Sequence, residues 1–192
     1  MYITHKTALF VLRRIRHGLG EQNQEKLTGT VEVDEAYIGG RPRFKGGLRG
    51  RGTDKVPVLG IVQRGGDVRF QMMERLTSDD LGKFPAYRKV GKAFEGGHEV
   101  VTHSAGEYVR LGTDVHSNTV EGVFSLIKRG VYGTFHSVSK KHLPNYLNEF
   151  QFRWNTRKMD DGQRVARAIK SVEFKRLEYR ESVENPPYRV GE

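Results

Sequence analysis

Residues 29–40 read Gly-Thr-Val-Glu-Val-Asp-Glu-Ala-Tyr-Ile-Gly-Gly, and this stretch decides the fold. Val31 and Val33 fall on odd positions. Glu32 and Asp34 fall on even ones, and this alternation is typical of a β-strand that the Gly-Gly pair ends. An acidic side chain inside such a run is costly unless a cation lies against it. Asp34 therefore indicates either a bound metal ion or an exposed edge-strand carboxylate that pairs with an arginine.

Composition narrows the class of protein. The chain has 192 residues, enough for one medium-sized domain, and its net charge of +10 favours a polyanionic partner such as nucleic acid. It contains no cysteine, which excludes disulfides, thiol catalysis and cysteine zinc sites. No apolar run approaches the roughly 20 residues of a membrane span, and the opening residues lack the form of a signal peptide. We therefore expect a cytoplasmic protein that does not contact membranes.

The first residues predict a basic helix. Residues 3–17 have the apolar spacing of an amphipathic helix, with Thr4 as its N-cap. Arg13, Arg14 and Arg16 are expected on its surface. One interpretation is the remainder of a helix-turn-helix, in which Arg13 and Arg14 contact DNA. The alternative is a plain amphipathic helix packed on the main domain.

An antiparallel meander is expected next. Residues 30–38, 56–63 and 68–76 read as strands, and Gly65-Gly66-Asp67 forms the turn between the last two. A mobile basic, glycine-rich loop separates the first two strands. It is expected either to neutralise DNA phosphates or to be a solvated surface loop. The candidate DNA contacts in it are Arg41, Arg43, Lys45, Arg49 and Arg51.

Helical spacing returns later in the chain. Residues 119–129 and 139–157 both have apolar residues on one helical face. A short helix around 86–92 and a short strand at 98–103 are expected before them. The tail from about Lys158 is charged and is expected to be loosely packed.

The helix over 119–129 also has a polar face. Glu121 and Lys128 are seven residues apart on it, about 10 Å along the helix axis. Asn118 lies one turn earlier on the same side. A metal-holding carboxylate followed by a cation suits a site that grips both a divalent ion and a phosphate. An ordinary solvated helix face gives the same pattern.

Further carboxylates follow the third strand at Asp79 and Asp80. If one of them converges with Asp34 and Glu121, the three carboxylates suit two Mg²⁺ or Mn²⁺ ions for in-line attack on a phosphodiester. A rival is a zinc hydrolase site, although its ligand spacing matches no standard motif. The residues of that rival site are His98, His103, Asp114 and His116.

Five ordered motifs resemble the ISXO2-like DDE transposases of prokaryotic insertion sequences, which are relatives of the Merlin transposons. The resemblance covers roughly residues 3–180. The motifs are Val31 to Gly40, Gly50 to Gly60, His103 to Val109, His116 to Gly130, and Gly133 to Arg157.

This resemblance implies an α/β, ribonuclease H-like three-layer domain with a mixed sheet and a two-metal site for DNA cleavage and strand transfer. Asp34 would be its first carboxylate and Asp79 its second. Glu121 or Asn118 would be the third site residue. The implied cofactor is Mg²⁺ or Mn²⁺, with two ions expected.

The resemblance also implies partners and a domain organisation. Lys128 would contact the transposon end, and the neighbouring Arg129 is a further candidate for DNA contact. Double-stranded DNA is the expected partner, and active copies are expected to form homo-oligomers. The expected divisions are a helix-turn-helix remnant at 1–20, a linker at 21–28, the catalytic domain at 29–158 and a charged tail at 159–192.

Two departures from the family pattern stand out. The family's N-terminal zinc ribbon has no counterpart, and the sequence begins inside the recognition-helix region. In addition, Asp79 follows the third strand with no room for the helix and fourth strand of a ribonuclease H-like core. We interpret this as an internal deletion that gives a truncated transposase. The alternatives are a catalytically inactive, basic DNA-binding remnant and a nuclease that uses the same fold on RNA or on structured DNA.

Overall fold

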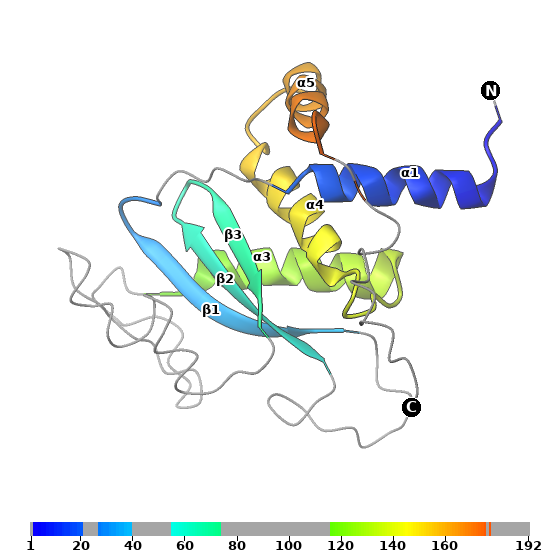
Figure 1. Cartoon of the computed structure of the whole chain (residues 1–192). Helices are drawn as coiled ribbons and strands as arrows, with labels where there is room; N and C mark the ends of the chain where they lie inside the picture. Colours follow the sequence, from blue (N-terminus) through cyan, green and yellow to red (C-terminus); the bar gives the residue numbers. More distant parts are fainter. Residues whose placement is uncertain (1, 21–26, 40–54, 74–115, 176, 178–192) are drawn as a thin grey trace, which may run out of the picture.

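The computed structural model of the chain describes residues 2–20, 27–39, 55–73, 116–175 and 177. Its centre is a three-stranded antiparallel sheet with the strand order β1-β2-β3 (Figure 1). The strands are β1 (Val31–Ile38), β2 (Val56–Gln63) and β3 (Val68–Met72). The expected meander is therefore confirmed, although β3 ends earlier than predicted. The short helix and short strand predicted around 86–103 lie outside the described residues.

The helices confirm the helical spacing of the sequence. They are α1 (His5–Gly18), α3 (Asn118–Arg129) with a π-helical continuation η3 (Gly130–Thr134), α4 (Leu143–Asn155) and α5 (Asp161–Val172). Helix α4 begins later than predicted, with Pro144 in its first turn, where the missing proline N–H costs no helical hydrogen bond. No helix in the described part of the chain is long and apolar enough to cross a membrane.

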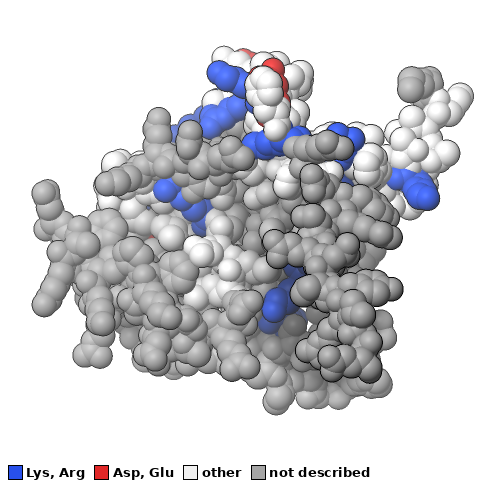
Figure 2. All heavy atoms as spheres, in the orientation of Figure 1, with Lys and Arg blue, Asp and Glu red and all other residues white. Residues whose placement is uncertain are grey.

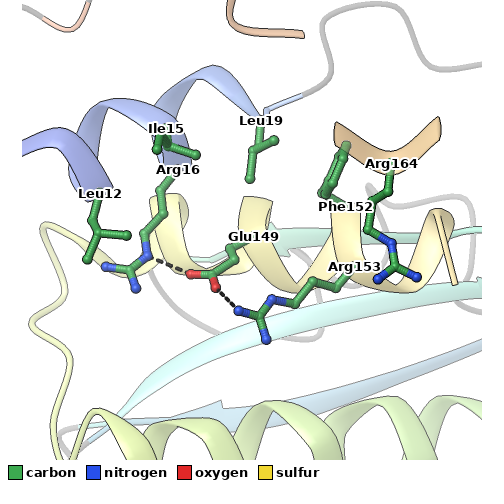
Figure 3. A pocket seen from close by; sticks show the side chains of 8 residues that line it. All are labelled: Leu12, Ile15, Arg16, Leu19, Glu149, Phe152, Arg153 and Arg164. Carbon is green, nitrogen blue, oxygen red and sulfur yellow. Dashed lines mark hydrogen bonds and ion pairs between the residues drawn. The ribbon is translucent and has the colours of Figure 1, made fainter. Parts of the chain in front are cut away.

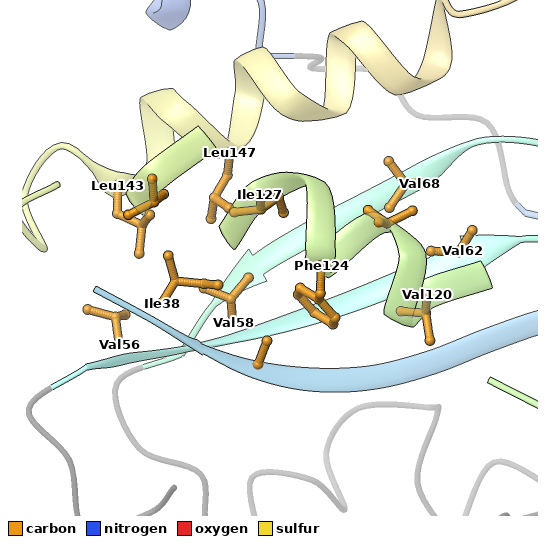
Figure 4. Packing of buried hydrophobic residues seen from close by; sticks show 13 residues of the cluster. Ile38, Val56, Val58, Val62, Val68, Val120, Phe124, Ile127, Leu143 and Leu147 are labelled. Atoms are coloured by element: carbon orange, nitrogen blue, oxygen red, sulfur yellow. The ribbon is translucent and has the colours of Figure 1, made fainter. Parts of the chain in front are cut away.

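The hydrophobic core lies between the sheet and two helices, α3 and α4 (Figure 4). Val58 and Val62 of β2 point into it and are fully buried. Leu59, on the opposite face of β2, is fully buried as well. The α/β class is thus confirmed. The sheet is antiparallel throughout its described strands, whereas a mixed sheet was expected.

The face of β1 that points into the core is not the one that carries Val31 and Val33. Glu32, Ala36 and Ile38 are the buried residues of the strand, at 5%, 4% and 1% exposure. These even positions lie on one face, because side chains alternate along a strand. Val31 and Val33, at odd positions, are only half-buried. A carboxylate therefore enters the interior on the same face as Asp34.

Helix α1 packs against α4 and α5 at the edge of the molecule. Its predicted N-cap is confirmed, since the Thr4 side chain accepts the backbone N–H of Thr7 at 3.2 Å. The expectation that Arg16 lies on the surface was wrong: it is 8% exposed and enters the interface with α4. There its Nε donates to Glu149 at 2.6 Å (Figure 3).

Helix α5 occupies a segment that was expected to be a loosely packed tail. Asp160 caps it by accepting the backbone N–H of Gln163 at 2.8 Å. No residue of α5 is buried, yet its end reaches α1. A Cβ on Gly18 would lie 2.3 Å from the side chain of Val172. The tail therefore contains a helix that the sequence analysis did not predict.

Candidate active site

Asp34 is half-buried in β1, on the side of the sheet that α3 covers. Its partner in the register is Gly60 of β2. A Cβ at Gly60 would lie 2.7 Å from the ring of Phe124 and 3.4 Å from Val120, so α3 approaches the sheet closely at this point. The absence of a side chain at Gly60 lets the helix pack beside the strand that carries Asp34.

Helix α3 carries the other described candidates for the site. Glu121 is half-buried, and its Oε1 accepts the hydroxyl of Ser117 at 3.0 Å. Asn118 is exposed, and its backbone N–H donates to Nδ1 of His116 at 3.3 Å. Lys128 and the residue after it, Arg129, are exposed near the C-terminal end of the helix. The two proposed third residues thus differ in burial as well as in charge.

Glu32, which is not among the residues predicted for the site, has an extensively bonded carboxylate. Its side chain is 3% exposed, and Nε of Arg64 donates to it at 2.7 Å. The backbone N–H groups of Thr119 and Val120 donate to its Oε2 at 2.8 and 3.0 Å. A cation therefore lies against Glu32 in the strand, and the cation expected beside Asp34 stays a prediction. No signal in the sequence pointed to Glu32, because its partners are 32 and 87 positions away along the chain.

His116 adjoins the same carboxylate. Its Nδ1 lies 3.4 Å from Glu32 and 3.3 Å from the backbone nitrogen of Asn118. Of the four residues in the rival zinc set, His116 alone lies within the described residues.

Some predicted residues cannot be placed. Asp79, Asp80 and the five cationic residues predicted to contact DNA from the loop between β1 and β2 lie outside the described residues. Among the residues that are described, no group of three or more His, Cys, Asp or Glu is close enough to hold a metal ion. Two carboxylates, those of Asp34 and Glu121, remain on elements that pack against each other.

Figure 2 shows separate Lys and Arg side chains around α1 and α5. Arg13 and Arg14 are exposed on α1, as expected, and the Arg14 guanidinium lies 5.4 Å from the ring centroid of Phe10. Burial, and then the charges of Arg13 and Lys141, lower the pKa of His142 below its ordinary value. The Arg13 charge thus acts at the start of α4 as well as at the surface.

Comparison with known families decides the identity. The family model described as the ISXO2-like transposase domain matches the chain over residues 26–86 and 83–155. The chain belongs to the ISXO2-like transposase family. No curated protein and no solved structure matches it. The resemblance drawn from the motifs is confirmed, and β1, β2, β3, α3 and α4 of the transposase all lie within the matched residues.

Proposed function

We propose that this chain is a DDE-type transposase domain that cleaves DNA strands and joins them to target DNA with two divalent metal ions. The observation that carries the proposal is the family match together with the placement of its first and third motifs. Asp34 in β1 and Glu121 in α3 come from different matched segments, and their elements pack together. An antiparallel β1-β2-β3 meander covered by a helix also supports the ribonuclease H-like fold.

The donor chemistry fits Mg²⁺ or Mn²⁺. Asp34 and Glu121 offer carboxylate oxygens, which hard divalent ions prefer. Asp79 is the proposed third ligand. Bound ions would activate the attacking oxygen and stabilise the leaving oxygen at the phosphodiester. We favour Glu121 over Asn118 as the ligand from α3, because it is half-buried and ionisable whereas Asn118 is a neutral, exposed side chain.

The remaining residues of the proposed site bind DNA. Lys128 and Arg129 are exposed on the helix that carries Glu121, where they would neutralise phosphates next to the cleaved bond. The basic loop residues Arg41 to Arg51, and Arg13 and Arg14 of α1, would extend this contact along the duplex. Double-stranded DNA is therefore the proposed partner, and two or more copies would bring element ends together.

We further propose that this copy is truncated inside its catalytic domain. The family model matches in two segments that overlap at residues 83–86, a few residues after Asp79. A chain that lacks residues near this point would match in two segments, and the short interval between β3 and Asp79 lies just before it. The deletion would change the approach of Asp79 to Asp34 and would lower activity without altering β1 and α3.

Nicking of supercoiled plasmid with Mg²⁺ or Mn²⁺ tests the proposal. The parent is compared with Asp34→Asn, Glu121→Gln and Asn118→Ala, and with Asp67→Asn as a matched control at an exposed acid in the β2–β3 turn. We expect the first two substitutions to abolish metal-dependent nicking, whereas Asn118→Ala and the control retain it. A parent that binds DNA without nicking it, or nicking that survives Asp34→Asn, contradicts the catalytic proposal.

A further inference from the structure

Glu32 is bonded by several donors, although it is not one of the three proposed metal ligands. Its Oε1 accepts Nε of Arg64 at 2.7 Å and the hydroxyl of Thr119 at 2.8 Å. Its Oε2 accepts the two backbone N–H groups of Thr119 and Val120. Four donors therefore converge on one carboxylate whose side chain is 3% exposed.

These contacts give Glu32 the role of an N-cap supplied from another element. Ser117 occupies the N-cap position of α3 but forms no capping hydrogen bond with its side chain. The free N–H groups of the first turn are instead satisfied by the carboxylate of β1, whose negative charge also complements the helix dipole. Arg64 strengthens the junction, because its guanidinium also donates to the carbonyl of His116 at 3.1 Å.

The junction adjoins both described carboxylates of the proposed site along the chain. Glu32 and Asp34 are on the same face of β1, two positions apart and about 7 Å along the strand. The residues that donate to Glu32, Thr119 and Val120, directly precede Glu121. The hydrogen bonds of the Glu32 carboxylate thus link the strand that carries Asp34 to the helical turn that carries Glu121.

We propose that Glu32 is a positioning residue that holds the start of α3 against β1, so that Asp34 and Glu121 reach the same metal ion. This inference rests on the proposed two-metal function. Gln in its place can present only one oxygen, and its NH₂ group would face either Arg64 or the helix N–H donors. Replacing a residue that orients the ligands of a metal ion typically changes metal affinity by about 10- to 100-fold.

The test measures Mn²⁺ binding to the full chain by electron paramagnetic resonance, together with the Mn²⁺ dependence of nicking. We expect Glu32→Gln to weaken Mn²⁺ binding about 10-fold or more, with metal-free DNA binding unchanged in fluorescence anisotropy. Thr119→Val removes only one donor and keeps the remaining contacts. It should weaken Mn²⁺ binding about 3- to 5-fold, and it provides the answer if Glu32→Gln does not fold.

Glu149→Gln is the matched control. Glu149 is also a largely buried carboxylate that pairs with arginines, but its ion pairs are with Arg16 of α1 and Arg153 of α4. It should lower stability without changing Mn²⁺ affinity. Unchanged Mn²⁺ affinity in both Glu32→Gln and Thr119→Val, or an equal loss in Glu149→Gln, overturns the positioning role.

Failure of the proposed function gives a different result. In that case the parent shows no Mn²⁺ binding that Asp34→Asn removes, and it does not nick DNA. That result overturns the positioning role as well, because there is then no metal site for Glu32 to position.

Discussion

Arg16 and Glu149 form the most enclosed ion pair between α1 and α4, with side-chain exposures of 9% and 13%. The Arg16 guanidinium also lies over the rings of Tyr146 and Phe135, at 4.1 and 5.0 Å from their centroids. Glu149→Gln leaves this buried cation without a charged partner. We expect the free energy of unfolding to fall by about 2 to 3 kcal/mol in urea titrations.

Arg153→Gln is the comparison for this prediction. Arg153 contacts the other oxygen of Glu149 at 2.6 Å, but its side chain is 67% exposed (Figure 3). A solvated ion pair contributes less than about 1 kcal/mol. Equal losses of unfolding free energy in Glu149→Gln and Arg153→Gln would show that burial does not control the strength of the two ion pairs of Glu149.

The packing of α3 requires glycine at position 60 of β2, whereas Gly122 within α3 itself can be replaced by alanine. Gly60→Ala would place a methyl group 2.7 Å from the Phe124 ring and push α3 away from β1 and β2. We expect it to cost about 1 to 3 kcal/mol of stability. Gly122→Ala meets no atom within 4 Å and should stabilise the helix by up to about 1 kcal/mol. Thermal unfolding followed by circular dichroism measures both, and a destabilised Gly122→Ala variant would contradict this account.

Helix α4 covers the outer edge of β3 with amide side chains. Asn155 accepts the N–H of Val68 at 2.8 Å and donates to its carbonyl at 3.2 Å, as a neighbouring strand would. Gln151, one turn earlier, accepts the N–H of Phe70 at 3.1 Å. These contacts satisfy an edge that otherwise invites pairing with another chain.

Asn155→Ala leaves both backbone groups of Val68 without these partners. We expect it to lower the free energy of unfolding by about 1 to 3 kcal/mol. Asn145→Ala, on the same helix, is the control, since the described residues form no hydrogen bond with that side chain. Urea titration followed through the fluorescence of Trp154 measures both variants, and equal stabilities would rule out this role for Asn155.

The charge of the whole molecule governs its predicted affinity for DNA. With a net charge of +10, binding to a short duplex should weaken steeply as salt is raised, because phosphate contacts release counterions.

Lys128→Gln should reduce the slope of log affinity against log salt by about 1. Lys170→Gln on α5 is the control and should leave the slope unchanged. Fluorescence anisotropy at about 50 to 300 mM salt tests the assignment of Lys128 to the DNA contact. An unchanged slope in Lys128→Gln removes that residue from the DNA contact.

Local patterns determined a large part of this protein. Alternation and turn residues predicted the β1-β2-β3 meander, and apolar spacing predicted α1, α3 and α4, because these signals depend on neighbours a few residues away. Motif order predicted the family. The helix in the tail was also within reach of the sequence: Asp160 is a suitable N-cap, and Val165, Ala168, Ile169 and Val172 have helical spacing.

Only the tertiary structure decided which charged residues are inside. Arg16 looks like a surface residue of a basic helix until α4 presents Glu149, 133 positions along the chain. Glu32 looks like a polar strand residue until Arg64 and the start of α3, 32 and 87 positions away, converge on it. The free energy of burying a charge depends on partners brought together by folding, and strand alternation carries no information about them.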